Sequence, residues 1–172
     1  MNGPSKPIDF IDALNRKVGR AVSWMTLLLV LITIYDIFMR YVCKSGSIWI
    51  QEAEWHLFAA NFMLAGGWTL LRDGHVRVDV LYAKFSPRAK AAVDALGTLL
   101  LLFPFCAMVI WASVPYVMDS WALLEGSPDP GGLPGRFLLK TVIPVTFLLI
   151  GLQGISLLVK NVLVLTAHGE RS

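Results

Sequence analysis

Several ionisable residues lie four positions apart, the spacing of one helical turn, and two such pairs could do chemistry. Asp36 and Arg40 are four residues apart, and so are His75 and Asp79. At this separation two side chains share a helix face, where an acid and a base can form an ion pair and a histidine and an aspartate can bind a metal or exchange protons. The stretch LLRDGHVRVDVL (70–81) also alternates valines with polar residues, a pattern typical of a half-buried strand. The elements around these residues decide between the two interpretations.

Long apolar runs dominate the composition. The chain has 172 residues, of which 56% are hydrophobic, above the roughly 45–50% of an ordinary soluble domain. Four runs contain the excess, and with its flanks each reaches the roughly 20 residues of helix needed to cross the hydrocarbon of a membrane. We therefore predict an all-α integral membrane protein, a single membrane domain (1–172) with four transmembrane helices. The predicted spans are 21–43, 48–71, 87–120 and 137–165.

The basic residues predict the orientation of these helices. Of the 15 lysines and arginines, eleven lie in the segments that hold both termini and the central loop, and four lie on the other side. By the positive-inside rule, both termini and the central loop are expected to lie in the cytoplasm. This topology accounts for the isoelectric point near 9.0, so the positive charge is no reason to invoke nucleic acid.

Three segments are expected to lie outside the spans. Residues 7–20 have apolar positions at helical spacing and several cations, which favours an amphipathic helix on membrane lipid; the alternative is a disordered, charged terminus. Segment 76–85 has the same period and favours a short amphipathic elbow helix over a strand. Segment 121–136 is rich in proline and glycine and is expected to form a stiff periplasmic loop. The elbow's polar residues, expected at the level of the lipid headgroups, are Arg72, His75, Arg77 and Asp79.

A second charged group opens the second predicted span, in WIQEAEWHLF (49–58). It contributes Glu52, Glu54 and His56, across a short loop from Asp36 and Arg40. Charges inside a membrane raise the hypothesis of a cation or proton site. A salt-bridge cluster that joins the first two helices is the favoured interpretation, because both signs are present and the rim of a membrane tolerates charge.

The residues needed for enzyme chemistry are missing from the sequence. Two of its three histidines fall in segments expected to be cytoplasmic, which argues against a haem site. The two cysteines, Cys43 and Cys106, are too far apart along their helices to form a redox pair, and there is no phosphate-binding glycine loop. No enzyme activity and no cofactor are expected. The middle of each predicted helix is almost uncharged, which favours a scaffold for a larger membrane partner over a complete transporter.

Several motifs, taken in order, resemble one family. They are RY at 40–41, WIQEAEWHLF at 49–58, GGWTLLRDGHVRVDVL at 66–81, SPRAKAAVD at 86–94 and DPGGLPGRFLLKTVIP at 129–144. Between four spans of these lengths, they resemble the small membrane subunit (Q-type, DctQ-like) of the tripartite ATP-independent periplasmic (TRAP) transporters. The resemblance extends from about residue 16 to residue 161.

The resemblance implies a non-catalytic permease subunit of a sodium-coupled, binding-protein-dependent importer of organic acids, located in a bacterial inner membrane. Its expected partners are a large multi-pass transport subunit, which it braces, and a periplasmic substrate-binding protein, which it helps to dock; the sodium ion is not expected to bind this chain. Residues expected at helix pairs or subunit contacts are Asp36, Arg40, Glu52, Glu54 and His56, and those expected at the docking surface are Glu125, Asp129 and Arg136. The alternative is a self-sufficient proton- or cation-coupled carrier or channel that uses Asp36, Glu52 and Glu54.

Overall fold

A computed structural model describes residues 6–74 and 82–167, and this part of the chain is helical, without strands. Its elements are α1 (Lys6–Tyr41), α2 (Ile48–Leu71), α4 (Pro87–Gly97), the π-helical turn η1 (Thr98–Leu102), α5 (Phe103–Ala122) and α6 (Arg136–Ala167). Helices α4, η1 and α5 follow one another without a break. They form one long rod, as predicted for the third span.

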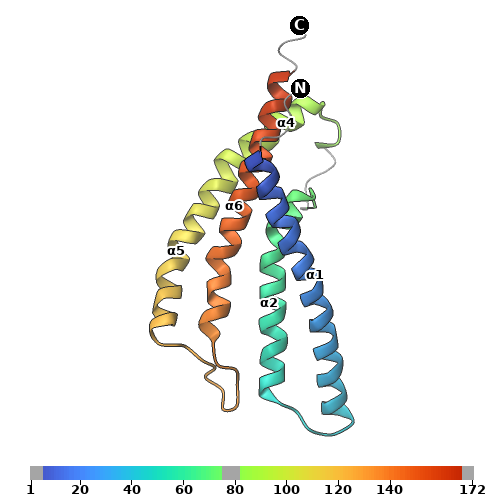
Figure 1. Cartoon of the computed structure of the whole chain (residues 1–172), viewed down its shortest axis with the longest axis vertical. Coiled ribbons are helices and arrows are strands. Elements are labelled where there is room, and N and C mark those ends of the chain that lie inside the picture. Colours follow the sequence, from blue (N-terminus) through green and yellow to red (C-terminus); the bar gives the residue numbers. More distant parts are fainter. Residues whose placement is uncertain (1–5, 75–81, 168–172) are drawn as a thin grey trace.

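The helices form two pairs that meet at one end of the molecule. Helix α1 packs along α2, α5 packs along α6, and α6 also contacts α2, α4 and α1. Figure 1 shows the pairs converging near the two termini and separating toward the α1–α2 and α5–α6 connections. We refer to these as the terminal end and the loop end. The start of α1 and the end of α6 thus lie on one side, while the side of a membrane that they face stays a prediction.

Three of the helical rods are long and apolar enough to cross a membrane: Lys6–Tyr41, Pro87–Ala122 and Arg136–Thr166, among the described residues. Helix α2 has 24 residues, about 36 Å at 1.5 Å per residue, so its length also suffices. Because of polar residues such as Glu52, Glu54 and Asn61, α2 is less apolar than the other three rods and is not among the helices apolar enough to cross. A fourth crossing stays a prediction.

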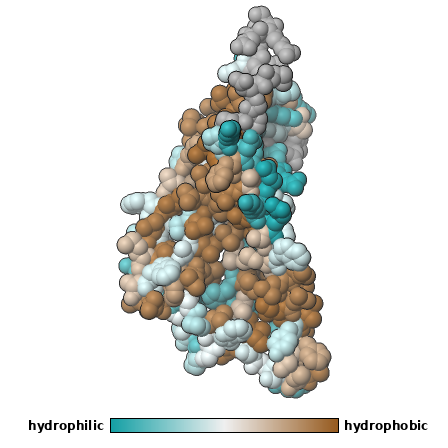
Figure 2. Space-filling view, viewed as in Figure 1, coloured by the Kyte–Doolittle hydropathy of each residue, from teal (hydrophilic) through white to brown (hydrophobic). Residues whose placement is uncertain are grey.

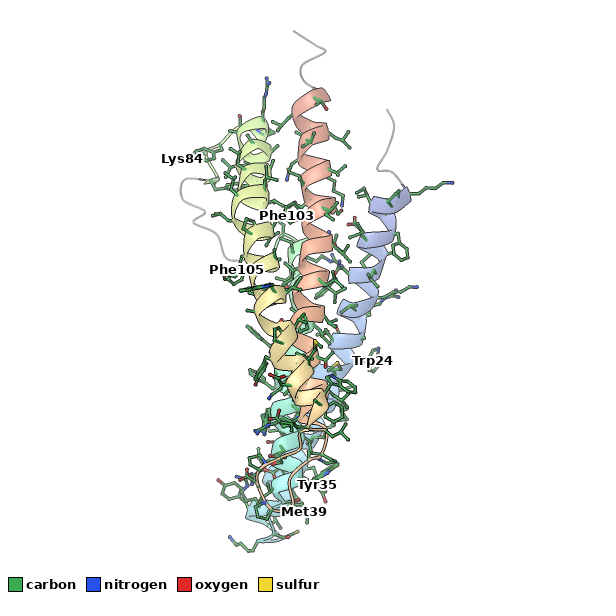
Figure 3. All side chains as sticks on the ribbon, turned by 90° about the vertical axis from the view of Figure 1, so that its left-hand side faces the viewer. Trp24, Tyr35, Met39, Lys84, Phe103 and Phe105 are labelled. Carbon is green, nitrogen blue, oxygen red and sulfur yellow. The ribbon has the colours of Figure 1, made fainter. Side chains whose placement is uncertain are left out.

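Large apolar side chains cover the outside of the bundle. Trp111 is 80% exposed, Phe62 75% and Trp24 70%. Apolar residues occupy much of the face in Figure 2, and Figure 3 shows Trp24 and Phe105 among the side chains on the outer surface of the rods. Such a surface is stable in lipid or against another membrane protein, as expected for an integral membrane protein.

Helix α1 differs from the expected division into a surface helix (7–20) and a span (21–43). The two segments form one continuous helix of 36 residues, about 54 Å long, against a hydrocarbon core of about 30 Å. The apolar face of its first turns packs within the protein: Ile8 is buried, and Gly19 leaves room for the Trp68 ring of α2. This intramolecular contact explains why the helix continues; its position relative to lipid is still a prediction.

The third rod begins with a capped turn and contains a π-helical turn. The Ser86 hydroxyl accepts a hydrogen bond from the Ala89 N–H at 3.2 Å, with Pro87 in the first turn, so Ser86 is the N-cap of α4. Before Pro104, which has no N–H to donate, the rod adopts the π-helical turn, and the Phe103 N–H reaches the Thr98 carbonyl. A π-helical turn is a recognised response to an interrupted helical ladder. It packs on Gly154, where a Cβ would lie 2.8 Å from Leu102.

A buried polar network ties α1 to α6 at the terminal end. The Asn15 amide donates to Gln153 Oε1 at 2.9 Å, and the Gln153 amide donates to Asp12 Oδ1 at 3.0 Å. The same oxygen accepts from the Ser156 hydroxyl at 2.6 Å, while Lys160 Nζ lies 2.5 Å from Asp12 Oδ2. Asn15 and Ser156 are completely buried. Because each donor of this network has a defined acceptor, it fixes the register of α1 on α6.

The network also meets α2, because Asn15 lies directly against Gly67. A Cβ at position 67 would overlap the Asn15 amide and come within 3.4 Å of the Leu149 carbonyl. Gly66 next to it leaves room for Ile150 of α6. The small residues of α2 therefore serve the protein's own helix packing at this point.

We predict that Asp12→Asn destabilises the isolated chain. The substitution removes the anion that Lys160 neutralises. It also turns an amide N–H group toward either the Lys160 ammonium or the donors of Gln153 and Ser156, at a cost of about 1–3 kcal/mol in the free energy of unfolding. Unfolding in mixed micelles with increasing denaturing detergent measures this change. Asp9→Asn is the matched control, because Asp9 is exposed on the same helix. Equal stability of the two variants would contradict the role assigned to the network.

Candidate functional site

The carboxylate of Glu52 holds the loop between α5 and α6 at the loop end. Glu52 is only 4% exposed, although it lies in the second turn of α2. Its Oε1 accepts from the Ser127 hydroxyl and its Oε2 from the Leu133 N–H, both at 2.5 Å. Bonds of this kind, from neutral donors to an ionised acceptor, are among the stronger ones in proteins. Glu52 thus ties α2 to a segment about 80 residues further along the chain.

The tip of this loop is a compact turn built on Ser127. The Ser127 hydroxyl accepts from the Asp129 N–H at 3.0 Å, and the Gly132 N–H donates to the Asp129 carbonyl at 3.0 Å. Gly132 has no room for a side chain, because a Cβ would overlap Ser127 and lie 2.6 Å from Glu52 Oε2. Gly131 next to it has a φ of 81°, a conformation that glycine adopts without strain. The turn leaves the Asp129 side chain exposed.

Glu125 and Lys140 form an ion pair at the base of the loop. The Ser120 hydroxyl adds a second hydrogen bond to the same Glu125 oxygen, at 2.6 Å. The Lys140 ammonium, followed by the Ser120 hydroxyl, holds the pKa of Glu125 below its usual value. Lys140 also lies over the Tyr116 ring, 4.1 Å from its centroid. Glu125, expected at a docking surface, is therefore engaged within the protein.

Arg136, the first residue of α6, stacks on α2. Its guanidinium carbon is 5.4 Å from the centroid of the Trp55 ring, close enough for a cation–π interaction. Trp55 also contacts the His56 ring, with centroids 3.8 Å apart. The His56 Nδ1 lies 2.7 Å from the Glu52 carbonyl of its own helix. The aromatic and basic residues of α2 and α6 thus form a layer beneath the loop.

The charged residues expected between α1 and α2 do not form one cluster. Asp36 pairs with Arg40 on its own helix, as their spacing allows, and Asp36 is buried. Glu52 bonds to the loop, and Glu54 has no hydrogen bond or ion pair to any described residue. No three His, Cys, Asp or Glu residues in the described part of the chain lie close enough to hold a metal ion.

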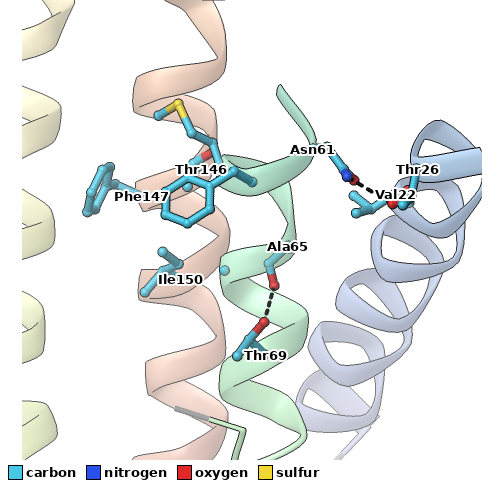
Figure 4. A pocket seen from close by; sticks show the side chains of 11 residues that line it. Val22, Thr26, Asn61, Ala65, Thr69, Thr146, Phe147 and Ile150 are labelled. Atoms are coloured by element: carbon cyan, nitrogen blue, oxygen red, sulfur yellow. Dashed lines mark hydrogen bonds between the residues drawn. The ribbon is translucent and has the colours of Figure 1, made fainter. Parts of the chain in front are cut away.

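A cavity of about 570 Å³ opens between α1, α2 and α6 (Figure 4). In it the Asn61 amide donates to Thr26 Oγ1 at 2.8 Å, and the Thr69 hydroxyl donates to the Ala65 carbonyl of its own helix at 2.9 Å. Thr146 and Ile150 of α6 form the facing wall. The lining contains no ionisable residue, so the cavity offers no charge to bind an organic anion or a cation.

The elbow is described only at its edges. Arg72 caps α2, and its guanidinium lies 5.5 Å from the centroid of the Trp68 ring. Three of the residues assigned to it, His75, Arg77 and Asp79, lie outside the described residues. Their expected role at the lipid headgroups stays a prediction.

Comparison with known protein families identifies the family of the chain. The family described as "Tripartite ATP-independent periplasmic transporters, DctQ component" matches residues 29–163, more than three quarters of the chain. The chain belongs to this family. It is therefore the small component of a TRAP transporter, which confirms the resemblance found in the sequence, and its family is one of transporter components rather than a known class of enzyme. No curated protein matches it significantly.

The TRAP small component has a polar network at the terminal end that sequence reasoning missed. Asp12 and Asn15 are three residues apart on α1, and Gln153, Ser156 and Lys160 recur at intervals of three and four on α6. This spacing places each set on one helix face. Gln153 and Ser156 are polar residues in an otherwise apolar run, and this contrast was the one sequence signal of a buried network. The spacing does not show that α1 packs against α6.

We predict that Glu52→Ala releases the loop without unfolding the helices. The Leu133 N–H loses its charged acceptor, so its hydrogen exchange should accelerate about tenfold or more. Exchange measured on the chain in lipid nanodiscs tests this. Gly132→Ala should also loosen the loop, by displacing Ser127 and Glu52. Glu54→Ala is the matched control, two residues away on α2, and acceleration by this variant as well would contradict a specific role for Glu52.

Proposed function

We propose that this TRAP small component is a non-catalytic brace for the large transport subunit of a sodium-coupled importer of organic acids. The observation that carries the proposal is the separation of its polar groups from its surface. The network of Asp12 and Gln153 and the bonds of Glu52 are directed inward, whereas the outer faces of the rods are apolar. A protein with these properties offers apolar contact area to a membrane partner, and among the described residues the cavity between α1, α2 and α6 is lined without charge.

Membership of the TRAP family supports the same proposal. The family belongs to tripartite transporters, so a large membrane subunit and a periplasmic substrate-binding protein are the expected partners. Four crossings, with both termini in the cytoplasm of a bacterium, would place the α5–α6 loop on the periplasmic side. There it would face the binding protein.

The carrier alternative gains no support from the carboxylates on which it depends. Both oxygens of Glu52 accept hydrogen bonds from the loop, and Asp36 is neutralised by Arg40. A coupling ion would have to displace these partners. Glu54 remains, on a different side of α2, as a single carboxylate.

The first test is reconstitution. The purified chain should form a stable complex with the large subunit of its system, and uptake in proteoliposomes should need both subunits, the binding protein and a sodium gradient. The chain alone should give no uptake above empty liposomes, because the cavity between α1, α2 and α6 has no charged group to bind substrate. Uptake by the chain alone would contradict the brace and favour the carrier.

We further propose that the exposed tip of the loop helps to dock the binding protein. Asp129→Lys should then reduce uptake severalfold when binding protein is limiting, because a charge at the rim of an interface acts mainly on the association rate. Saturating binding protein should restore the rate, and the membrane complex should stay intact. Lys44→Glu, a charge reversal in the exposed α1–α2 connection, is the control. Unchanged uptake by Asp129→Lys at limiting binding protein would remove the loop tip from the docking surface.

A further inference from the structure

Glu52 and Glu54 are two residues apart on α2 and face different surroundings. Two positions on an α-helix differ by about 200° in direction, so the side chains point to different sides. Glu52 reaches the loop. Glu54 lines a shallow groove of about 300 Å³ between α1 and α2, together with Leu29 and Thr33 of α1 and Phe58 of α2.

The carboxylate of Glu54 is half covered and unpaired. Its Oε1 is buried and has no hydrogen-bond partner, whereas Oε2 is not among the buried atoms that lack one. Glu54 makes no ion pair with a described residue. Three basic residues of the loop end have partners elsewhere: Arg40 pairs with Asp36, Lys140 pairs with Glu125, and Arg136 stacks on Trp55. Lys44 is exposed in the α1–α2 connection. One oxygen is thus desolvated by the protein, and the other is open to a partner.

The surface around Glu54 carries exposed apolar side chains of both helices of the pair. Phe58 is 61% exposed, and Leu28 and Leu31, near the groove in sequence, are 47% and 56% exposed. A carboxylate beside exposed apolar side chains is costly in hydrocarbon unless a cation neutralises it. Lipid tails cannot do so, because they carry neither charge nor hydrogen-bond donor. A lysine or arginine on a neighbouring membrane helix can neutralise the carboxylate and donate a hydrogen bond to it.

We propose that Glu54 forms an ion pair with a basic side chain on a membrane helix of the large transport subunit, and that this helix lies along the α1–α2 groove. The inference rests on the proposed function, because it takes the large subunit as the partner. It adds which face of the small component makes the contact and the chemistry that recognises it. The charge of Glu54 is then a device for subunit pairing and takes no part in transport by this chain.

The test measures association of the two subunits by fluorescence energy transfer between labelled subunits in liposomes, diluted with lipid. Glu54→Gln should weaken association about threefold to twentyfold, the range of single polar contacts between membrane helices. Glu54→Lys should weaken it further through repulsion, and Glu54→Asp should retain part of it. Asp119→Asn, at an exposed carboxylate near the loop end of α5, is the matched control and should have no effect.

Stability of the isolated chain separates subunit pairing from an internal role. Because Glu54 has no partner within the described chain, Glu54→Gln should leave its unfolding unchanged. A loss of stability on Glu54→Gln would overturn the proposal. Equally strong association of wild type, Glu54→Gln and Glu54→Lys would also overturn it, but the proposed bracing function would stand. Failure of the wild-type chain to associate with the large subunit would contradict the bracing function as well.

A photo-crosslinking residue in place of Phe58 identifies what occupies the groove. In the intact complex it should capture a peptide of the large subunit that contains a lysine or arginine. Reversal of that residue to glutamate should restore association of Glu54→Lys. Capture of lipid alone, which would indicate that a lipid headgroup covers Glu54, would overturn the proposal.

Discussion

The first and last helices of the molecule are joined by the Asp12 carboxylate, which accepts hydrogen bonds from Gln153, Ser156 and Lys160 of α6. The same α1 face carries Asn15, which bonds to Gln153 and lies against Gly67 of α2. Three helices therefore meet at one buried polar point. The apolar contacts elsewhere in the bundle specify little by themselves, because apolar side chains pack about as well in lipid as on one another. The register of the helices thus depends on this junction.

The loop end is organised on a different principle. There the two helix pairs diverge, and Glu52 connects them through the α5–α6 loop rather than through direct helix contact. Glu125 and Lys140 hold the base of the same loop. A molecule that is closed at one end and bridged by a loop at the other leaves long apolar faces uncovered. This shape is more typical of a component that adds contact area to a membrane assembly than of one that encloses its own transport path.

Some local sequence signals indicate where a helix begins. Ser86 and Pro87 mark the start of α4, because capping chemistry acts over a few residues. Helix α2 has the bounds of the second predicted span, although Ser47 forms no side-chain cap there. The segments expected as a surface helix (7–20) and a span (21–43) form one continuous helix, α1. The face of its first turns packs on other helices of the protein, with Ile8 buried and Gly19 against Trp68. The four-residue spacing of Asp36 and Arg40 was sufficient to indicate their ion pair.

Contacts between distant segments could not be predicted in the same way. Nothing local distinguishes Glu52, which holds the loop, from Glu54, which holds nothing in the described chain, because their difference depends on where α5 and α6 lie. Likewise, Asp12 looked like one of several charges in a cationic N-terminal segment. The α6 groups that donate hydrogen bonds to its carboxylate are identified only when α6 is placed beside it.

The pairing of Asp12 and Asn15 with α6 bears on how the protein is made. During synthesis α1 leaves the ribosome first, about 140 residues before its partners on α6. Until then its carboxylate and amide must be satisfied by water, lipid headgroups or the insertion machinery. The chain can reach its final structure only when its last helix is inserted. Truncated or stalled chains therefore carry an exposed polar face on α1, a mark by which membrane quality control can distinguish them from finished ones.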